Sequence, residues 1–233
     1  AEYLNQASAR GDVFLDTGSG VIFGRNGPFH NQYYIKITGG FSSPEEFIVF
    51  DPVEGEFFPQ SGFEQFPVTR LTWYGAAAFC DFYGLRLPTE AEWEKACRGG
   101  QQLEFGTQDG TLTHDLANFA GTGGRDTYQG AAPVGSFPPN PFGLFDMCAN
   151  AAEHVFDLYD PDYYQNSPNE NPKGPGPPMP VGRLDFITVI RGGGGNSSSI
   201  FCRSAFRGVF DNLPDLEVLS GTLSGFRVAR SLP

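Results

Sequence analysis

Residues that could hold a metal ion or attack a substrate are few in this chain and widely spaced. The four cysteines are Cys80, Cys97, Cys148 and Cys202. They include no CxxC motif, so neither a zinc knuckle nor a thioredoxin-type site is expected, and they fit either buried thiols or one or two disulfides. The three histidines are His30, His114 and His154. None of these lies at the i, i+4 spacing of a helical metal pair.

Oxygen atoms are the other candidate ligands, because the chain is acidic. It has 27 Asp and Glu residues against 15 Lys and Arg residues, a net charge of −12. A nucleic-acid partner needs a basic footprint, so none is expected. An acidic chain can hold Ca²⁺ through carboxylate and carbonyl oxygens, although acidity also serves plain solubility.

Length and composition indicate a loop-rich globular protein. The 233 residues fit one large domain or two small ones, and they are enough to bury a sizeable core. The 31 Gly, 19 Pro and 23 Phe residues are typical of a protein rich in loops and aromatic side chains, rather than of a helical bundle. No apolar run approaches membrane-spanning length, so no transmembrane segment is expected.

Caps and hydrophobic patterns place two helices and several strands. Thr72 can cap a helix over residues 73–83. Thr89 and Glu92 have the spacing of a capping box, which starts a second helix over residues 91–97. Short apolar runs between turn residues predict strands at 13–15, 21–23, 33–37 and 47–50. Together these elements indicate a single domain of the α+β class.

Two short apolar strands frame the C-terminal segment, residues 189–233. The first strand opens with Val189–Gly193, and the second lies within Ser224–Arg230. Between them, residues 195–221 mix small, polar and apolar side chains with a period of neither 2 nor 3.6. Because a core element needs periodicity to select its buried face, this segment is either a displayed surface or a long ordinary loop.

A series of ordered motifs carries a resemblance to a known family. The first group is Pro67–Tyr74, Ala77–Cys80 and Leu85–Glu94. The motifs that follow are Pro133–Val134, Pro138–Asn140, Phe142–Met147, Asn150–Glu153, Arg191–Gly193 and Gly225–Ala229. They resemble the formylglycine-generating enzyme (sulfatase-modifying factor) superfamily over roughly residues 66–233. The resemblance implies a C-type lectin-like fold, with a small twisted antiparallel sheet, two helices and long loops.

The superfamily contains three kinds of protein. Some members are oxidases that convert a sulfatase cysteine to formylglycine, and others are iron enzymes that join sulfur to histidine derivatives. A third group is non-enzymatic and includes the variable proteins of diversity-generating retroelements, which display varied residues on the lectin fold. We expect one such domain over residues 1–233, in which 1–66 are a divergent N-terminal part and 189–233 form a C-terminal display segment.

The metal ligands of the enzymatic members are not matched in this sequence. The oxidases bind copper through two cysteines just after the Arg-Gly-Gly strand, where soft thiolates suit Cu(I). This chain has only Cys202 there, for which a packed core position is expected. Enzymatic relatives also hold a Trp after this strand, whereas Gly194-Gly195 stand here, and His154 replaces another usual Trp. We therefore expect no copper, no iron site and no catalytic residue.

The resemblance implies two structural calcium sites, both built from hard oxygen ligands. The first would use side chains of Asn118 and Asp126 and carbonyls of Phe119 and Tyr128. The second would use carboxylates of Asp146 and Glu153 and carbonyls of Ala149 and Ala151. The alternative for the second set is that its two carboxylates cap turns and pair with arginines. Either site would stabilise loops without doing chemistry.

In variable proteins the diversified codons cannot encode Lys, Gln, Glu, Met or Trp. Residues 195–224 contain only one of these, Glu217, where the composition of the whole chain would give about four. The fixed scaffold of that family matches Cys202-Arg203, Ala205, Arg207, Pro214 and Gly225–Arg227. The predicted ligand-binding surface fills the gaps and comprises Asn196, Ser198, Ser199, Ile200, Phe201, Ser204, Phe206, Gly208, Val209, Phe210, Asp211 and Leu213.

The leading hypothesis is a non-enzymatic variable protein that binds a protein or other macromolecular ligand. It would be exposed on a cell surface or carried by a phage. On this hypothesis Ile200, Phe206, Val209 and Phe210 are exposed on one face, above buried Cys202, Ala205 and Phe226, because solvent-facing apolar side chains are costly unless they bind something. The alternatives are an oxidase or iron enzyme with an altered metal site, and a pseudoenzyme scaffold.

Overall fold

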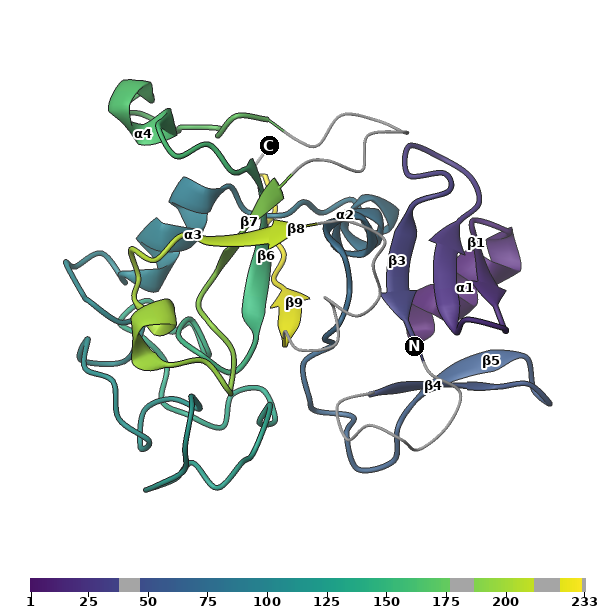
Figure 1. The fold of residues 1–233 in the computed structure, drawn as a ribbon, viewed down its shortest axis with the longest axis horizontal. Helices are drawn as coiled ribbons and strands as arrows, with labels where there is room; N and C mark the ends of the chain where they lie inside the picture. Colours follow the sequence, from purple (N-terminus) through teal and green to yellow (C-terminus); the bar gives the residue numbers. More distant parts are fainter. Residues whose placement is uncertain (38–46, 177–186, 212–222, 232–233) are drawn as a thin grey trace.

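A computed structural model describes residues 1–37, 47–176, 187–211 and 223–231. Figure 1 shows two groups of elements side by side, with the N-terminal elements packed next to α2 and the C-terminal sheet next to α3. Across the described ranges, no helix has both the length and the apolar character needed to cross a membrane.

The N-terminal part consists of one helix, a three-stranded sheet and a hairpin. Helix α1 spans Glu2–Arg10 and ends at Gly11, which adopts the left-handed conformation that glycine permits. The antiparallel sheet has the order β1-β2-β3, and β4 pairs with β5. These strands are β1 (Val13–Asp16), β2 (Val21–Gly24), β3 (Tyr33–Lys36), β4 (Ile48–Asp51) and β5 (Glu56–Pro59).

Helix α2 (Trp73–Phe82) joins this part to the rest of the chain. The Thr72 hydroxyl accepts a hydrogen bond from the Gly75 N–H at 3.2 Å, which caps the helix. A side chain at Gly75 would place its Cβ 2.4 Å from the Tyr34 carbonyl oxygen, so glycine is required where α2 approaches β3. The largest core cluster accordingly combines Leu4, Ile22 and Tyr34 with Trp73 of α2.

The second layer is a four-stranded sheet covered by helix α3 (Glu90–Cys97). Thr89 and Glu92 form the predicted capping box at the start of that helix. The strand order is β8-β7-β6-β9, in which β9 runs parallel to β6 and the other pairs are antiparallel. The remaining elements are β6 (Ala152–Leu158), α4 (Tyr163–Asn166), β7 (Ile187–Arg191), the 3₁₀ helix η1 (Ser199–Cys202), β8 (Gly208–Asp211) and β9 (Ser224–Phe226).

A second core cluster fills the space between α3 and the sheet. Trp93 and Cys97 of α3 pack with Met147 and with Val155 and Val189 of the two central strands. All five side chains are buried, so this cluster fixes α3 above β6 and β7.

The α+β fold class is confirmed, and both predicted helices are present. Two helices, α1 and α4, and three strands, β5, β6 and β8, were not predicted. The second framing strand ends at Phe226, well before Arg230. The single-domain interpretation of residues 1–233 stays a prediction, although the shared core cluster of α1, the first sheet and α2 favours it.

Candidate ligand-binding surface

A buried arginine at the end of β7 anchors the C-terminal segment. Arg191 Nη1 donates to Glu90 Oε1 at 3.0 Å. Its Nη2 donates to Glu94 Oε2 and to the Ser204 carbonyl oxygen, both at 2.5 Å. The Arg191 and Glu90 side chains are fully buried. Breaking such a pair leaves an uncompensated buried charge, so the contacts hold the segment that follows η1 against α3.

A glycine turn leads from β7 to η1. Gly192 and Gly193 have φ values of 90° and 72°, which L side chains rarely adopt. A Cβ at Gly195 would lie 2.4 Å from the Gly130 carbonyl oxygen. The close approach of two backbones therefore requires a glycine at position 195 of the Gly194-Gly195 pair.

Beyond this turn, apolar side chains stand in solvent. Ile200 is 55% exposed, Phe201 44% and Val209 52%. Phe206 is half-buried, and its ring meets that of Phe201 edge to face with centroids 5.0 Å apart. Asn196, Ser198 and Ser199 of the same segment are exposed polar residues. This group of seven residues is called the display surface below.

Several predicted members of the surface are instead in the core. Phe210 is only 4% exposed, because β8 alternates: Val209 faces solvent while the Phe210 ring packs edge-on against His154. The predicted exposure of Phe210 is therefore wrong. Ser204 is fully buried as well, and its Oγ lies 3.3 Å from Cys97 Sγ.

The predictions for Gly208 and for two of the residues expected to be buried beneath the surface are also wrong. Gly208 is buried, and a Cβ there would lie 2.8 Å from Ile190 Cγ1, so no side chain fits. Cys202 is buried, as predicted, but Ala205 is exposed and Phe226 is half-buried. The side chain of Asp211 and all of Leu213 lie outside the described residues.

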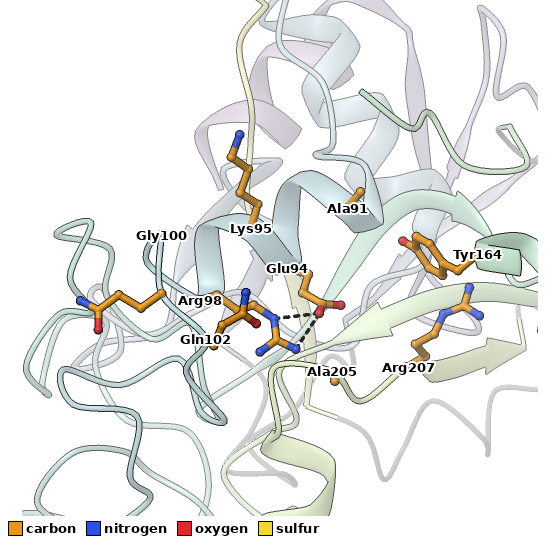
Figure 2. A pocket seen from close by; sticks show the side chains of 10 residues that line it. Ala91, Glu94, Lys95, Arg98, Gly100, Gln102, Tyr164, Ala205 and Arg207 are labelled. Carbon is orange, nitrogen blue, oxygen red and sulfur yellow. Dashed lines mark hydrogen bonds and ion pairs between the residues drawn. The ribbon is translucent and has the colours of Figure 1, made fainter. Parts of the chain in front are cut away.

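A hollow of about 610 Å³ adjoins the display surface. It lies between α3 and the segment that carries Ala205 and Arg207, and Tyr164 closes one side. Figure 2 shows the Arg98 guanidinium facing the Glu94 carboxylate within it; the shortest contact is 2.8 Å. The hollow was not foreseen, since its walls come from segments far apart in the sequence.

At the wall of the hollow that contains Arg207, a charged network is centred on the buried carboxylate of Glu90. Arg207 Nε and Nη2 donate to the two Glu90 carboxylate oxygens, each at 2.8 Å. The Arg207 guanidinium also lies 5.0 Å from the ring centres of Tyr159 and Tyr164. Arg207 is therefore held in place, and its assignment to the fixed scaffold stays a prediction.

Asp157 lies under this network. Its Oδ2 accepts a hydrogen bond from the Glu90 N–H at 2.6 Å. Burial raises the pKa of Asp157 to about 7, and the nearby Glu90 carboxylate adds to the rise. The carboxyl group thus titrates near neutrality while it caps α3.

The first predicted calcium set fits a bound cation. Asn118 and Asp126 are both fully buried. Asn118 Oδ1 is buried with no hydrogen-bond partner among the described residues, the kind of orphaned oxygen that a cation would satisfy. The backbone carbonyls of Phe119 and Tyr128 accept no hydrogen bond within the described ranges. Amide, carboxylate and carbonyl oxygens are the ligands that Ca²⁺ prefers.

His114 also belongs to this loop and was missed by the sequence reasoning. Its Nδ1 lies 3.0 Å from Asp126 Oδ2, and its ring stacks on Phe119 with centroids 4.1 Å apart. Asp126 Oδ1 accepts from the Tyr128 N–H at 3.2 Å. These contacts orient the carboxylate and leave it lone pairs for a further partner.

The second predicted calcium set does not fit. Glu153 receives both Nε and Nη2 of Arg227, at 2.5 and 2.6 Å, and the Trp93 indole N–H at 2.6 Å. Asp146 Oδ2 accepts from the Gly135 N–H at 2.7 Å. The carboxylates thus cap a turn and pair with an arginine, which is the alternative given for Asp146, Ala149, Ala151 and Glu153.

The cysteines are buried free thiols. Cys148 Sγ donates to the Cys202 carbonyl at 3.3 Å, and Cys97 Sγ donates to the Met147 carbonyl at 3.3 Å. Burial raises the pKa of Cys97 to about 11 and that of Cys80 to about 12, so neither is a ready nucleophile. Over the described ranges, no three His, Cys, Asp or Glu side chains gather closely enough to hold a metal.

Comparisons with known proteins agree with this geometry. The model of the sulfatase-modifying factor enzyme 1-like domain matches residues 51–232. The formylglycine-generating enzyme of Bos taurus is 35% identical over 175 residues, covering 70% of this chain and 43% of that protein. Serine/threonine-protein kinase pkn1 of Chlamydia caviae is 39% identical over 140 residues, covering 60% of this chain and 21% of that protein. The chain therefore spans less than half the length of these relatives.

A solved structure shows the same fold. Treponema denticola variable protein 1 superposes with a TM-score of 0.54 at 21% identity, covering 73% of this chain and 74% of that one. At this identity the likeness establishes the architecture, a C-type lectin-like fold, and nothing finer.

Proposed function

This chain belongs to the sulfatase-modifying factor enzyme 1-like domain family, and within that family we propose that it is a non-enzymatic binding protein. In this proposal it is a variable protein of a diversity-generating retroelement. The display surface, Asn196, Ser198–Phe201, Phe206 and Val209, would contact a protein or other macromolecular ligand. The ligand would lie outside the cell or particle that carries the protein.

The observation that carries the proposal is that buried, hydrogen-bonded residues, which form a fixed frame, alternate with exposed residues along the C-terminal segment. Arg191, Cys202 and Ser204 are fully buried and hydrogen-bonded. Between and beside them, Ile200 and Val209 are more than half exposed. Variation at exposed positions does not threaten a fold that has only about 5–15 kcal/mol of stability to lose. Frame and display positions alternate along the segment, as repeated diversification requires.

The apolar character of the surface supports a macromolecular ligand. Phe201 and Phe206 pack against each other at the surface rather than in the core. Exposed aromatic side chains surrounded by polar ones are common anchors of protein interfaces. A small polar substrate would gain little from such a flat apolar group.

Copper oxidation is the less favoured function. The single cysteine after the Arg-Gly-Gly strand, Cys202, is fully buried, and its Sγ lies 3.7 Å from the Ser198 carbonyl oxygen. Two neighbouring thiolates suit Cu(I), and this segment supplies one buried thiol. Formylglycine formed in a cysteine-containing sulfatase peptide, with copper supplied, would overturn the binding-protein proposal.

We also propose a structural Ca²⁺ in the loop that contains Asn118 and Asp126. The two side chains, with the carbonyls of Phe119 and Tyr128, would hold the ion. Its role would be to fix the loop: the Ala120 N–H donates to the Ser197 carbonyl at 3.0 Å, so the loop adjoins the display segment.

Serine substitution tests the display surface directly. The triple variant Ile200→Ser, Phe201→Ser and Val209→Ser removes three exposed apolar side chains. We expect the free energy of unfolding to change by less than about 0.5 kcal/mol per site, as is usual for surface positions. The matched control, Phe210→Ser in the same strand, should cost about 3–5 kcal/mol because it empties a core site. Urea unfolding of all three proteins measures this, and loss of folding in the triple variant would overturn the proposal.

Genomic DNA supplies the independent test of diversification. We expect a near-copy of the stretch of about a hundred bases that includes the codons for the display surface, beside a reverse-transcriptase gene. The two copies should differ only at adenines of the template, within codons for the display surface. If sequencing of the flanking DNA finds no such repeat, the protein is not a retroelement variable protein.

A further inference from the structure

A second hollow of about 600 Å³ lies against another face of α3. Ala91 and Lys95 line both this hollow and the one beside the display surface. Figure 2 shows Lys95 extending away from Ala205 and Arg207, which lie on the display side. The opposite wall comes from the loop after α4, with Asn169, Asn171 and Lys173.

The hollow gathers positive charge in an acidic protein. Its lining contains three cationic side chains, Arg86, Lys95 and Lys173, and a single carboxylate, Glu92. Arg86 neutralises that carboxylate with two hydrogen bonds of 2.6 and 2.8 Å. Neither lysine forms an ion pair with any described residue.

This concentration of charge differs from the rest of the chain. The protein carries a net charge of −12 and contains only three lysines. Two of the three, Lys95 and Lys173, line this hollow. Both lysines are exposed, and an anion bound between them would be attracted by both charges.

The other walls offer hydrogen bonds and one apolar face. The amides of Asn169 and Asn171 are exposed, and each supplies both donors and an acceptor. Phe156, half-buried on β6, and Pro172 contribute apolar surface. Cations, paired donors and acceptors, and a flat apolar face together match a ligand that is charged on one side and hydroxylated over the rest.

We propose that this hollow binds a hydroxylated organic anion of the uronic-acid sugar type. Lys95 and Lys173 pair with carboxylates, the two asparagine amides bind hydroxyl groups, and the sugar ring packs on Phe156. The site is separate from the display surface and goes beyond the proposed function. It would bind its sugar ligand regardless of which ligand the display surface recognises.

Titration of the chain with digalacturonate at low ionic strength, followed by calorimetry, tests the proposal. We expect saturable binding that weakens as salt is added. Maltose, a neutral disaccharide, should bind at least tenfold more weakly. The double variant Lys95→Ala and Lys173→Ala should weaken binding of digalacturonate at least tenfold, and Asn169→Ala with Asn171→Ala should weaken it as well.

Lys36→Ala is the matched control, because Lys36 lies on β3 and is the one lysine outside the hollow. It should leave the affinity unchanged. Absence of digalacturonate binding, or equal losses in the Lys36 and Lys95 variants, would overturn the site. An Asp-Glu dipeptide that binds as tightly as digalacturonate would overturn the sugar assignment. The display-surface variants should bind digalacturonate normally, so failure here is distinguishable from failure of the proposed function.

Discussion

At the scale of single residues, buried His154, which packs against the display segment, makes the stability of the protein depend on pH. The side chain is fully buried on β6, and Nε2 lies 3.1 Å from the Leu71 carbonyl oxygen, to which it can donate. Nδ1 has no hydrogen-bond partner among the described residues, and Phe210 of β8 packs against the ring. Protonation would place a charge in this apolar site, so burial lowers the pKa of His154 to about 4.

The first prediction at this scale concerns acid stability. Between about pH 4 and 6.5 the unfolded chain binds a proton at His154 and the native protein does not. The His154 contribution is therefore complete above pH 6.5 and is lost as the pH falls towards 4. We expect His154→Gln, which keeps a donor for the Leu71 carbonyl, to remove this dependence. Urea unfolding at several pH values measures it.

Asp157 provides the contrast, because its pKa is raised and its contribution to stability therefore changes with pH in the opposite direction. Its pKa is raised to about 7 in the native state from an ordinary value of 3.8, so the native protein holds the proton more tightly. Its contribution to stability falls as the pH rises through that window. The stability difference between parent and Asp157→Asn should thus change with pH in the opposite sense to that for His154→Gln. Parallel pH profiles for parent and His154→Gln would contradict the assignment to His154.

At the scale of elements, α3 holds the C-terminal segment through its first turn. Glu90 binds Arg191 of β7 and also Arg207, which leads into β8. Its side chain is fully buried, whereas the Arg203–Glu104 pair is 49% and 60% exposed. Because one network is buried and the other pair is exposed, removing one partner from each should lower the free energy of unfolding by very different amounts.

We expect Glu90→Gln to destabilise the protein by about 3–5 kcal/mol, because it leaves buried arginine charge without a partner. Glu104→Gln removes one partner of an exposed pair and should cost no more than about 1 kcal/mol. Chemical denaturation of both variants gives the comparison. Similar losses in the two variants would show that the buried network does not anchor the segment.

The elements also show what sequence alone could supply. Helices α2 and α3 were predictable because Thr72 and Thr89 cap them locally. Helix α1 has Ala1 at its start with no side-chain cap, and only Leu4 and Ala7 are buried, so it left no comparable signal. Packing against β1 and β5 stabilises α1, and such contacts are not visible in a local pattern.

The site was predictable to a similar extent. Exposure of Ile200 and Val209 was inferred correctly, and that of Phe210 was not. Strand β8 has only four residues, too few for its alternation to stand out from the irregular sequence around it. The partners of Glu90 lie 101 and 117 residues away in the chain, so the charged network needed the folded structure.

At the scale of the whole molecule, the net charge of −12 means that a bound cation should stabilise the entire folded chain. Self-repulsion of a strongly charged chain destabilises its compact state, and a bound cation relieves part of it. The proposed ion would also satisfy Asn118 Oδ1, whose lack of a partner in the described structure costs free energy. An ion that binds only the native state stabilises it by about 2.7 kcal/mol at a hundredfold excess over its dissociation constant.

We therefore expect Ca²⁺ to raise the melting temperature by about 5–10 °C relative to chelator, given about 2–4 °C per kcal/mol for a chain of this size. Asp126→Asn keeps an acceptor for the Tyr128 N–H but removes the charge, so it should abolish most of the shift. Asp115→Asn is the control: its exposed carboxylate lies in the same loop and accepts only from the Arg125 N–H among the described residues. Calorimetric melting of the three proteins decides the matter. Equal shifts in all three would place the ion elsewhere, and no shift in the parent would reject the calcium site.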